Sequence, residues 1–171
     1  MKKFIYTLLI VLFSISTIKA QTCLITKDGY TIPNNANLHV TNEPGGYLND
    51  KIALAIQNGF TNINIGQGWF YVSSPIIVPA GVTIKGGGVT TYISPIVTET
   101  FPNIITSIFS VSTNGSVIKN MEIQTHNGYY DGAALCGIEI LGGANNNVFE
   151  NLYFGRSEGN TASTPPFIKF E

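Results

Sequence analysis

Charged side chains are scarce in this chain, since lysine, arginine, aspartate and glutamate make up only 11% of its 171 residues. The positive charges are not clustered and the formal net charge is −1, so the sequence lacks the basic surface that a nucleic-acid-binding protein requires. The low charge also argues against a helical bundle, which is rich in alanine, leucine, glutamate and lysine. We therefore expect no nucleic acid as a partner and no all-helical fold.

The apolar run at the start of the chain, residues 4–15, is too short to cross a bilayer, which takes about 20 residues. It follows the basic pair Lys2 and Lys3 and precedes the small residue Ala20. This order is typical of a secretory signal peptide, and we expect cleavage after Ala20. Cleavage removes three lysines and leaves a formal charge of −4. We expect a secreted or periplasmic protein of a bacterial cell envelope, with no membrane span after signal removal.

Cysteine is rare, with only Cys23 and Cys136 present, and neither belongs to a CxxC motif or a His/Cys cluster. Zinc binding is therefore not indicated. Export makes a disulfide possible. However, Cys23 lies in a terminus that we expect to be mobile, and the apolar context of Cys136 also suits a buried free thiol. Both alternatives, a disulfide and free thiols, stay open.

What the sequence has in abundance is glycine, at 18 residues, and short runs that alternate apolar with polar residues. Between positions 62 and 88 these runs are separated by glycine and proline, which predicts short strands joined by bends. Neither a helical pattern nor an Asn-Gly hairpin signal lies between them. Strands that bend without reversing predict a coil of parallel strands, a β-solenoid.

An internal repeat supports the solenoid. Residues 117–123 match residues 148–154 at an offset of 31 positions, and Asn114 and Asn145 fall at the same offset. Each unit places an Asn between an apolar pair and an alternating strand, where it can stack on the Asn of a neighbouring coil. The alternation directs Glu122 and Tyr153 outward.

One amphipathic helix is expected just before the strands, over residues 50–57. Asn49 can serve as its N-cap, and Asp50 places a negative charge in the first turn. Leu48, Ile52, Ala55 and Ile56 fall on one face, and Gly59 is a C-terminal stop. We expect this helix to cover the apolar end of the first coil.

These segments together carry a family resemblance. The helix is followed by Asn-Ile-Asn-Ile-Gly (62–66), Gly-Trp-Phe-Tyr-Val (68–72), Ile-Ile-Val-Pro-Ala-Gly (76–81) and Val-Thr-Ile-Lys-Gly-Gly-Gly (82–88). This order resembles the N-terminal part of pectate-lyase-like proteins, and residues 117–154 share their general style. The family comprises right-handed parallel β-helices, among them polysaccharide lyases, polygalacturonase-like hydrolases and phage tailspikes. The resemblance implies an all-β fold, a right-handed parallel β-helix with an N-terminal capping helix, and the strand runs suggest about three coils.

The expected organisation has three parts: a signal peptide (1–20), an entry segment (21–47) with short strands near 24–26 and 30–32, and a parallel β-helix domain (48–171). A final apolar run, 167–170, looks like the beginning of a strand. With nothing after it to cap the last coil, we expect the domain to be incomplete at its C-terminal end and able to self-associate.

The resemblance implies a polysaccharide or cell-surface glycan as partner, but many chemistries share this scaffold. The Asn-Thr-Asp, Asp-Asp, Gly-His-Gly and Arg-Ile-Lys motifs of the hydrolase relatives are absent, and the carboxylates are scattered. We therefore assign no catalytic residue and expect this chain alone not to cleave polysaccharides. Three alternatives remain: the N-terminal part of a secreted polysaccharide-degrading lyase or glycoside hydrolase, a non-catalytic carbohydrate-binding or adhesive β-helix, and a structural solenoid.

The best candidate for glycan contact is a loop at 125–134. It contains His126, Tyr129, Tyr130 and Asp131, and loops on a rigid scaffold often carry binding residues. Tyrosines can stack on sugar rings, and Asp can bind hydroxyls or take part in a calcium site, so calcium is the one cofactor considered and no other is expected. The alternative is that the tyrosines pack onto the coil. Trp69 and Tyr71 are likewise either outward sugar platforms or core.

Overall fold

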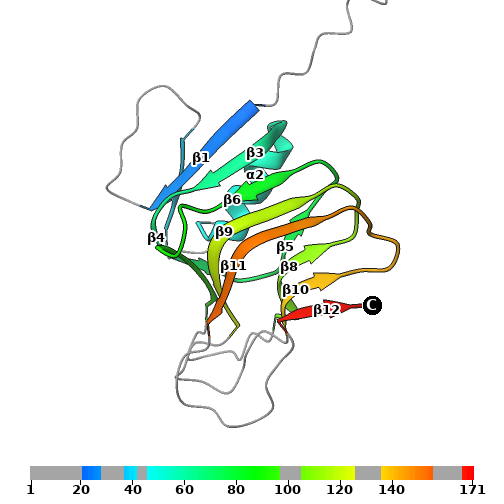
Figure 1. Ribbon diagram of the computed structural model, residues 1–171. Coiled ribbons are helices and arrows are strands. Elements are labelled where there is room, and N and C mark those ends of the chain that lie inside the picture. Colours follow the sequence, from blue (N-terminus) through cyan, green and yellow to red (C-terminus); the bar gives the residue numbers. More distant parts are fainter. Residues whose placement is uncertain (1–20, 28–36, 42–45, 97–104, 126–135, 156–166) are drawn as a thin grey trace, which may run out of the picture.

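The computed structural model describes residues 21–27, 37–41, 46–96, 105–125, 136–155 and 167–171, and it consists of parallel strands that curl round one axis, with a short helix (Figure 1). The predictions of a β-solenoid and of one short helix are thus confirmed. The described elements are β1 (Gln21–Lys27), β2 (Asn37–Val40), α2 (Leu48–Gln57), β3 (Phe60–Ile65), β4 (Gly68–Val72), β5 (Ile76–Val78), β6 (Thr83–Lys85), β7 (Thr91–Pro95), β8 (Ser107–Val111), β9 (Val117–Gln124), β10 (Cys136–Ile140), β11 (Val148–Gly155) and β12 (Ile168–Phe170).

The strands build three faces, in which every described pairing is parallel. Face A is formed by β1, β3, β6 and the first halves of β9 and β11, with β2 beside β1. Face B is formed by β4, β7 and the second halves of β9 and β11. Face C is formed by β5, β8, β10 and β12. The chain passes from face A to B to C and then begins the next coil, which is the topology of a parallel β-helix.

This succession gives four coils, made of β3–β5, β6–β8, β9–β10 and β11–β12. The sequence suggested about three coils. The additional one arises because the short β12 pairs with β10 and completes a coil that β11 begins. The strand expected near 24–26 is present as part of β1, whereas the one expected near 30–32 lies outside the described residues.

The core lies inside the coils, where side chains of equivalent strands stack in rows. On face A, Ile63, Ile84 and Ile118 occupy successive coils in register, and all three are fully buried. On face C, Ile76, Phe109 and Ile138 form the equivalent row. Burial of these branched and aromatic side chains removes apolar surface from water, which is the main favourable term for the fold.

The corner between faces A and B is formed within β9 and β11, which both bend round the axis (Figure 1). Asn120 and Asn151 sit at these bends with φ of 58° and 51°. The left-handed residue shifts the strand alternation by one position, so Ile118 and Met121 are both buried. Asn tolerates this conformation better than most residues, because its short polar side chain can hydrogen-bond locally. The expected contact between Asn side chains of neighbouring coils is confirmed.

The N-terminal end is covered by α2, which packs Leu48, Ile52 and Ala55 against the first coil. The prediction that Asn49 is the N-cap is wrong. Tyr47 is the N-cap, and its backbone N–H donates to Asp50 Oδ2 at 3.2 Å. Asn49 is instead turned toward the body of the protein, where it binds the connection between β4 and β5.

Both cysteines are buried thiols rather than the two halves of a disulfide, which confirms the second of the two alternatives. The expectation that Cys23 lies in a mobile terminus is wrong, because β1 pairs with β3 and places this side chain in the core. Within the described part of the chain, no helix has the length and apolarity that crossing a bilayer requires.

Candidate functional site

The loop residues singled out in the sequence, His126, Tyr129, Tyr130 and Asp131, lie outside the described residues. Their assignment as glycan-binding residues therefore stays a prediction. The structure instead directs attention to the outer surface of face B, where aromatic side chains recur on successive coils.

Four outward residues of face B lie in one row across the coils. Trp69 on β4 pairs in register with Tyr92 on β7. Tyr92 pairs with Glu122 on β9, and Glu122 pairs with Tyr153 on β11. We call this row, Trp69–Tyr92–Glu122–Tyr153, the aromatic row. Because neighbouring strands lie about 4.8 Å apart, it extends over ~14 Å along the axis of the β-helix.

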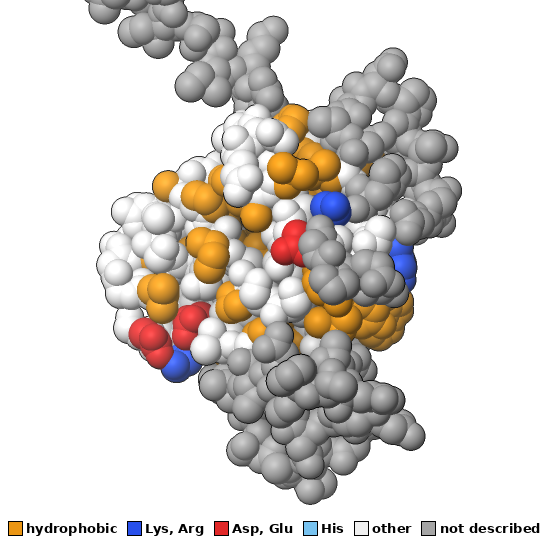
Figure 2. Space-filling view, turned by 180° about the vertical axis from the view of Figure 1, so that it is seen from behind, with side chains coloured by type: hydrophobic (Ala, Val, Ile, Leu, Met, Phe, Trp, Pro, Cys, Tyr) orange, Lys and Arg blue, Asp and Glu red, His pale blue; other side chains and the backbone are white. Residues whose placement is uncertain are grey.

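The rings of the aromatic row are accessible to a ligand. Trp69 is 44% exposed and Tyr153 is 54% exposed. Trp69 and Tyr92 stack with ring centroids 4.6 Å apart and an interplanar angle of 10°. In Figure 2 hydrophobic side chains gather at the right of the view, on the side of the molecule where β4 lies. Trp69 is thus an outward platform, and Tyr71, which follows it two residues later and is half-buried, also points outward.

Glu122 interrupts the aromatic row with a carboxylate that is held in place. Gln124 Nε2 donates to Glu122 Oε1 at 3.0 Å. Gly155 lies in the next coil, where it pairs with Gln124, and it leaves space for this carboxylate. A Cβ atom at Gly155 would stand 2.5 Å from Glu122 Oε1, far inside contact distance. The glycine is therefore required for the observed position of the Glu122 side chain.

No lysine or arginine is among the outward residues that the structure describes on face B. The described lysines of the middle coils, Lys85 and Lys119, lie on face A instead, in register with each other. Lys119 Nζ is 3.8 Å from Glu150 Oε2. Face B therefore combines aromatic rings with one carboxylate and no described positive charge.

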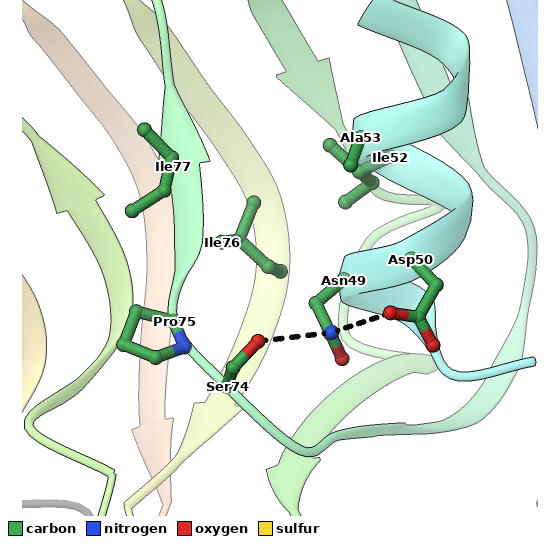
Figure 3. A pocket seen from close by; sticks show the side chains of 8 residues that line it. All are labelled: Asn49, Asp50, Ile52, Ala53, Ser74, Pro75, Ile76 and Ile77. Carbon is green, nitrogen blue, oxygen red and sulfur yellow. Dashed lines mark hydrogen bonds between the residues drawn. The ribbon is translucent and has the colours of Figure 1, made fainter. Parts of the chain in front are cut away.

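A shallow pocket of about 240 Å³ lies where α2 meets the first coil (Figure 3). Its polar groups are already used within the protein. Asn49 Nδ2 donates to Ser74 Oγ and to Asp50 Oδ1, each at 3.0 Å, and Asn49 Oδ1 accepts from the Ser73 N–H. The rest of the lining is largely apolar, with Ile52, Ala53, Pro75, Ile76 and Ile77. This arrangement fixes the helix to the corner and offers a ligand few free polar groups.

Three charged residues gather at the C-terminal end of face C. Lys169 Nζ lies 3.8 Å from Glu139 Oε1 and also contacts the Glu171 carboxylate. Figure 2 shows these charges at the lower left of the view. Across the described ranges, no three His, Cys, Asp or Glu side chains lie close enough together to hold a metal ion. A calcium site through Asp131 stays a prediction.

Comparison of the chain with family models, with curated proteins and with solved structures found no match. The aromatic row must therefore be judged on its own chemistry. The sequence offers Trp69 as a candidate sugar platform, and its alternation directs Glu122 and Tyr153 outward. It does not indicate Tyr92 or the alignment of all four residues, since their separations along the chain are unequal. The available signal was the offset of 31 positions that relates Glu122 to Tyr153.

Proposed function

We propose that this protein is a secreted carbohydrate-binding β-helix of the pectate-lyase-like type, which binds a glycan chain along the aromatic row of face B. The observation that carries the proposal is the register of Trp69, Tyr92, Glu122 and Tyr153 across four coils. A linear polysaccharide is a ligand of matching shape, because the row runs along the axis of the fold for ~14 Å.

The chemistry of the row suits sugars. Aromatic side chains offer large apolar contact area with little conformational freedom to lose, and tyrosine adds a hydroxyl that can form a hydrogen bond. A carboxylate between the rings accepts hydrogen bonds from hydroxyl groups. The site is also built on strands of a regular scaffold rather than on loops, which favours a fixed geometry.

A second candidate is the one that the family resemblance favours, the N-terminal part of a polysaccharide-degrading lyase or glycoside hydrolase. In such a protein the aromatic row would hold the substrate chain while other coils carry out the reaction. The two candidates differ in product formation, and the loop residues Tyr129, Tyr130 and Asp131 would add contacts to the glycan in either case.

The proposal is tested by binding to a panel of soluble and insoluble polysaccharides. We expect the exported protein to bind at least one of them, and Trp69→Ala or Tyr153→Ala to weaken that binding about five- to thirtyfold, as an aromatic contact of roughly 1–2 kcal/mol is lost. Ile77→Ala is the matched control, since Ile77 is an outward residue on face C and is 59% exposed. Equal binding by all three variants would show that face B is not the binding surface.

A further inference from the structure

We propose that face B selects uncharged glycans and discriminates against polyuronates, and that Glu122 is the residue responsible for this preference. The inference rests on the proposed carbohydrate binding and names the chemical class of the ligand.

The position of Glu122 supports this preference. It lies between Tyr92 and Tyr153 in the aromatic row, one strand spacing from each. A glycan that stacks on these rings must therefore pass over the carboxylate, at hydrogen-bonding range of its sugar groups. The hydroxyl or carboxylate group that the sugar carries at this point would therefore contact Glu122.

The Glu122 carboxylate is also oriented before a ligand arrives. Gln124 Nε2 donates to Oε1 at 3.0 Å, and Gly155 leaves the space that Oε1 occupies. An ionised carboxylate can accept about four hydrogen bonds, so Gln124 leaves most of this capacity for other donors. Hydroxyl groups of a neutral sugar can donate to it, and little side-chain freedom is lost on binding because the group is already held.

The charges of face B favour the same preference. None of the described outward residues of face B is a lysine or arginine, while Lys119 lies on face A beside Glu150. A uronate carboxylate over Glu122 would place two negative charges close together without a described cation between them. Like charges in such a position are strongly unfavourable, and neither group can donate a hydrogen bond while both are ionised.

The test compares β-1,4-linked hexamers of glucose, xylose and mannose with an oligogalacturonate of the same length, by titration calorimetry at low salt. The wild-type protein should bind at least one neutral hexamer and should bind the oligogalacturonate at least about tenfold more weakly. Glu122→Gln should weaken binding of the neutral hexamer about tenfold, since a hydrogen bond to a charged acceptor is lost. The same variant should improve binding of the oligogalacturonate, because the repulsion is removed.

Glu150→Gln is the matched control, because it removes one carboxylate from face A with the same change in net charge. It should leave both affinities unchanged. Oligogalacturonate binding as tight as that of the neutral hexamers, or equal effects of Glu122→Gln and Glu150→Gln, would overturn the inference. If the oligogalacturonate is bound and Tyr153→Ala abolishes that binding, the proposed function survives without the preference. If no glycan is bound at all, both proposals fail.

Discussion

The side-chain amide of Asn151 donates a hydrogen bond of 3.1 Å to Oδ1 of Asn120, one coil away, and both residues have a left-handed backbone. The bond links the corners of two neighbouring coils at the point where face A turns into face B. It also explains why the internal repeat has an Asn at this position. The same residue type supplies both the tolerance of positive φ and the polar group that bonds to the next coil.

Replacing Asn120 by Ala should lower the free energy of unfolding by about 1–2 kcal/mol, because Ala lacks the polar side chain that helps Asn adopt the left-handed conformation and because the hydrogen bond from Asn151 is lost. Asn120→Gly should cost less, since glycine adopts positive φ readily and only the side-chain hydrogen bond is lost. Urea denaturation measures both changes. If Ala and Gly variants are equally stable, the backbone conformation is not what selects Asn at this corner.

Close packing between coils gives a second prediction. A Cβ atom at Gly86 would stand 2.3 Å from the carbonyl oxygen of Asn120 in the next coil, and backbone cannot move aside as a flexible side chain can. Gly86→Ala should therefore destabilise the protein by about 1–3 kcal/mol or more.

The control for this prediction is Gly142→Ala, where the nearest atom to the added Cβ is 3.5 Å away. Its stability should change by less than about 1 kcal/mol, because a glycine at ordinary φ can be replaced without a clash. Comparable losses in the two thermal midpoints would rule out the coil-to-coil contact as the reason for glycine at position 86.

The fold could be predicted where strand alternation was visible. Strands β3 to β6 each have one buried and one accessible side, so their apolar residues alternate in the sequence. Strand β8 gives no such signal, because all five of its residues are buried, Ser107 and Ser110 included. Alternation disappears when both sides of a strand are covered, and only the pairing with β5 and β10 identifies β8.

The candidate site was less predictable than the fold. The sequence does not decide between a surface and a core position for Trp69, because neighbouring residues of a strand point to opposite sides and the sequence does not show which side faces the core. Tyr92 could not be joined to Glu122 without the register between β7 and β9. A row that crosses coils is a property of strand pairing, whereas the sequence most readily shows neighbours along the chain, such as Tyr129 and Tyr130.

The buried thiols give a prediction for alkaline pH. Burial raises the pKa of the Cys136 thiol to about 11, with the carboxylates of Glu139 and Glu171 acting in the same direction and Lys169 opposing them. Burial also raises the pKa of Cys23. In the unfolded chain a thiol titrates near pH 8.5. Because the pKa is higher in the folded state, the stability contribution of the thiol is fully present below about pH 8.5, the pKa of the unfolded chain. It is lost as the pH rises toward 11.

We therefore expect the free energy of unfolding to fall as the pH rises from about 9 toward 11, with a slope of up to roughly 1.4 kcal/mol per pH unit from Cys136. Tyrosines and lysines titrate in the same range, so the measurement needs Cys136→Ala as a reference. Chemical denaturation of both proteins at several pH values should give a shallower decline for the variant. Parallel declines would mean that Cys136 does not contribute to the alkaline instability.

The last prediction concerns Gly155. It separates the effect of the Glu122 carboxylate position on glycan binding from any effect on the stability of the fold. Gly155→Ala would place a Cβ atom 2.5 Å from Glu122 Oε1 and 3.2 Å from Gln124 Cγ. Both are atoms of flexible, partly exposed side chains, so they can move aside and the unfolding midpoint should change little. The carboxylate, however, must leave its position beside Gln124 Nε2, and its orientation toward a ligand is then lost. Glycan binding should weaken about as much as in Glu122→Gln, whereas Gly142→Ala should bind normally. A variant that keeps full affinity would show that the position of the Glu122 carboxylate does not matter for recognition.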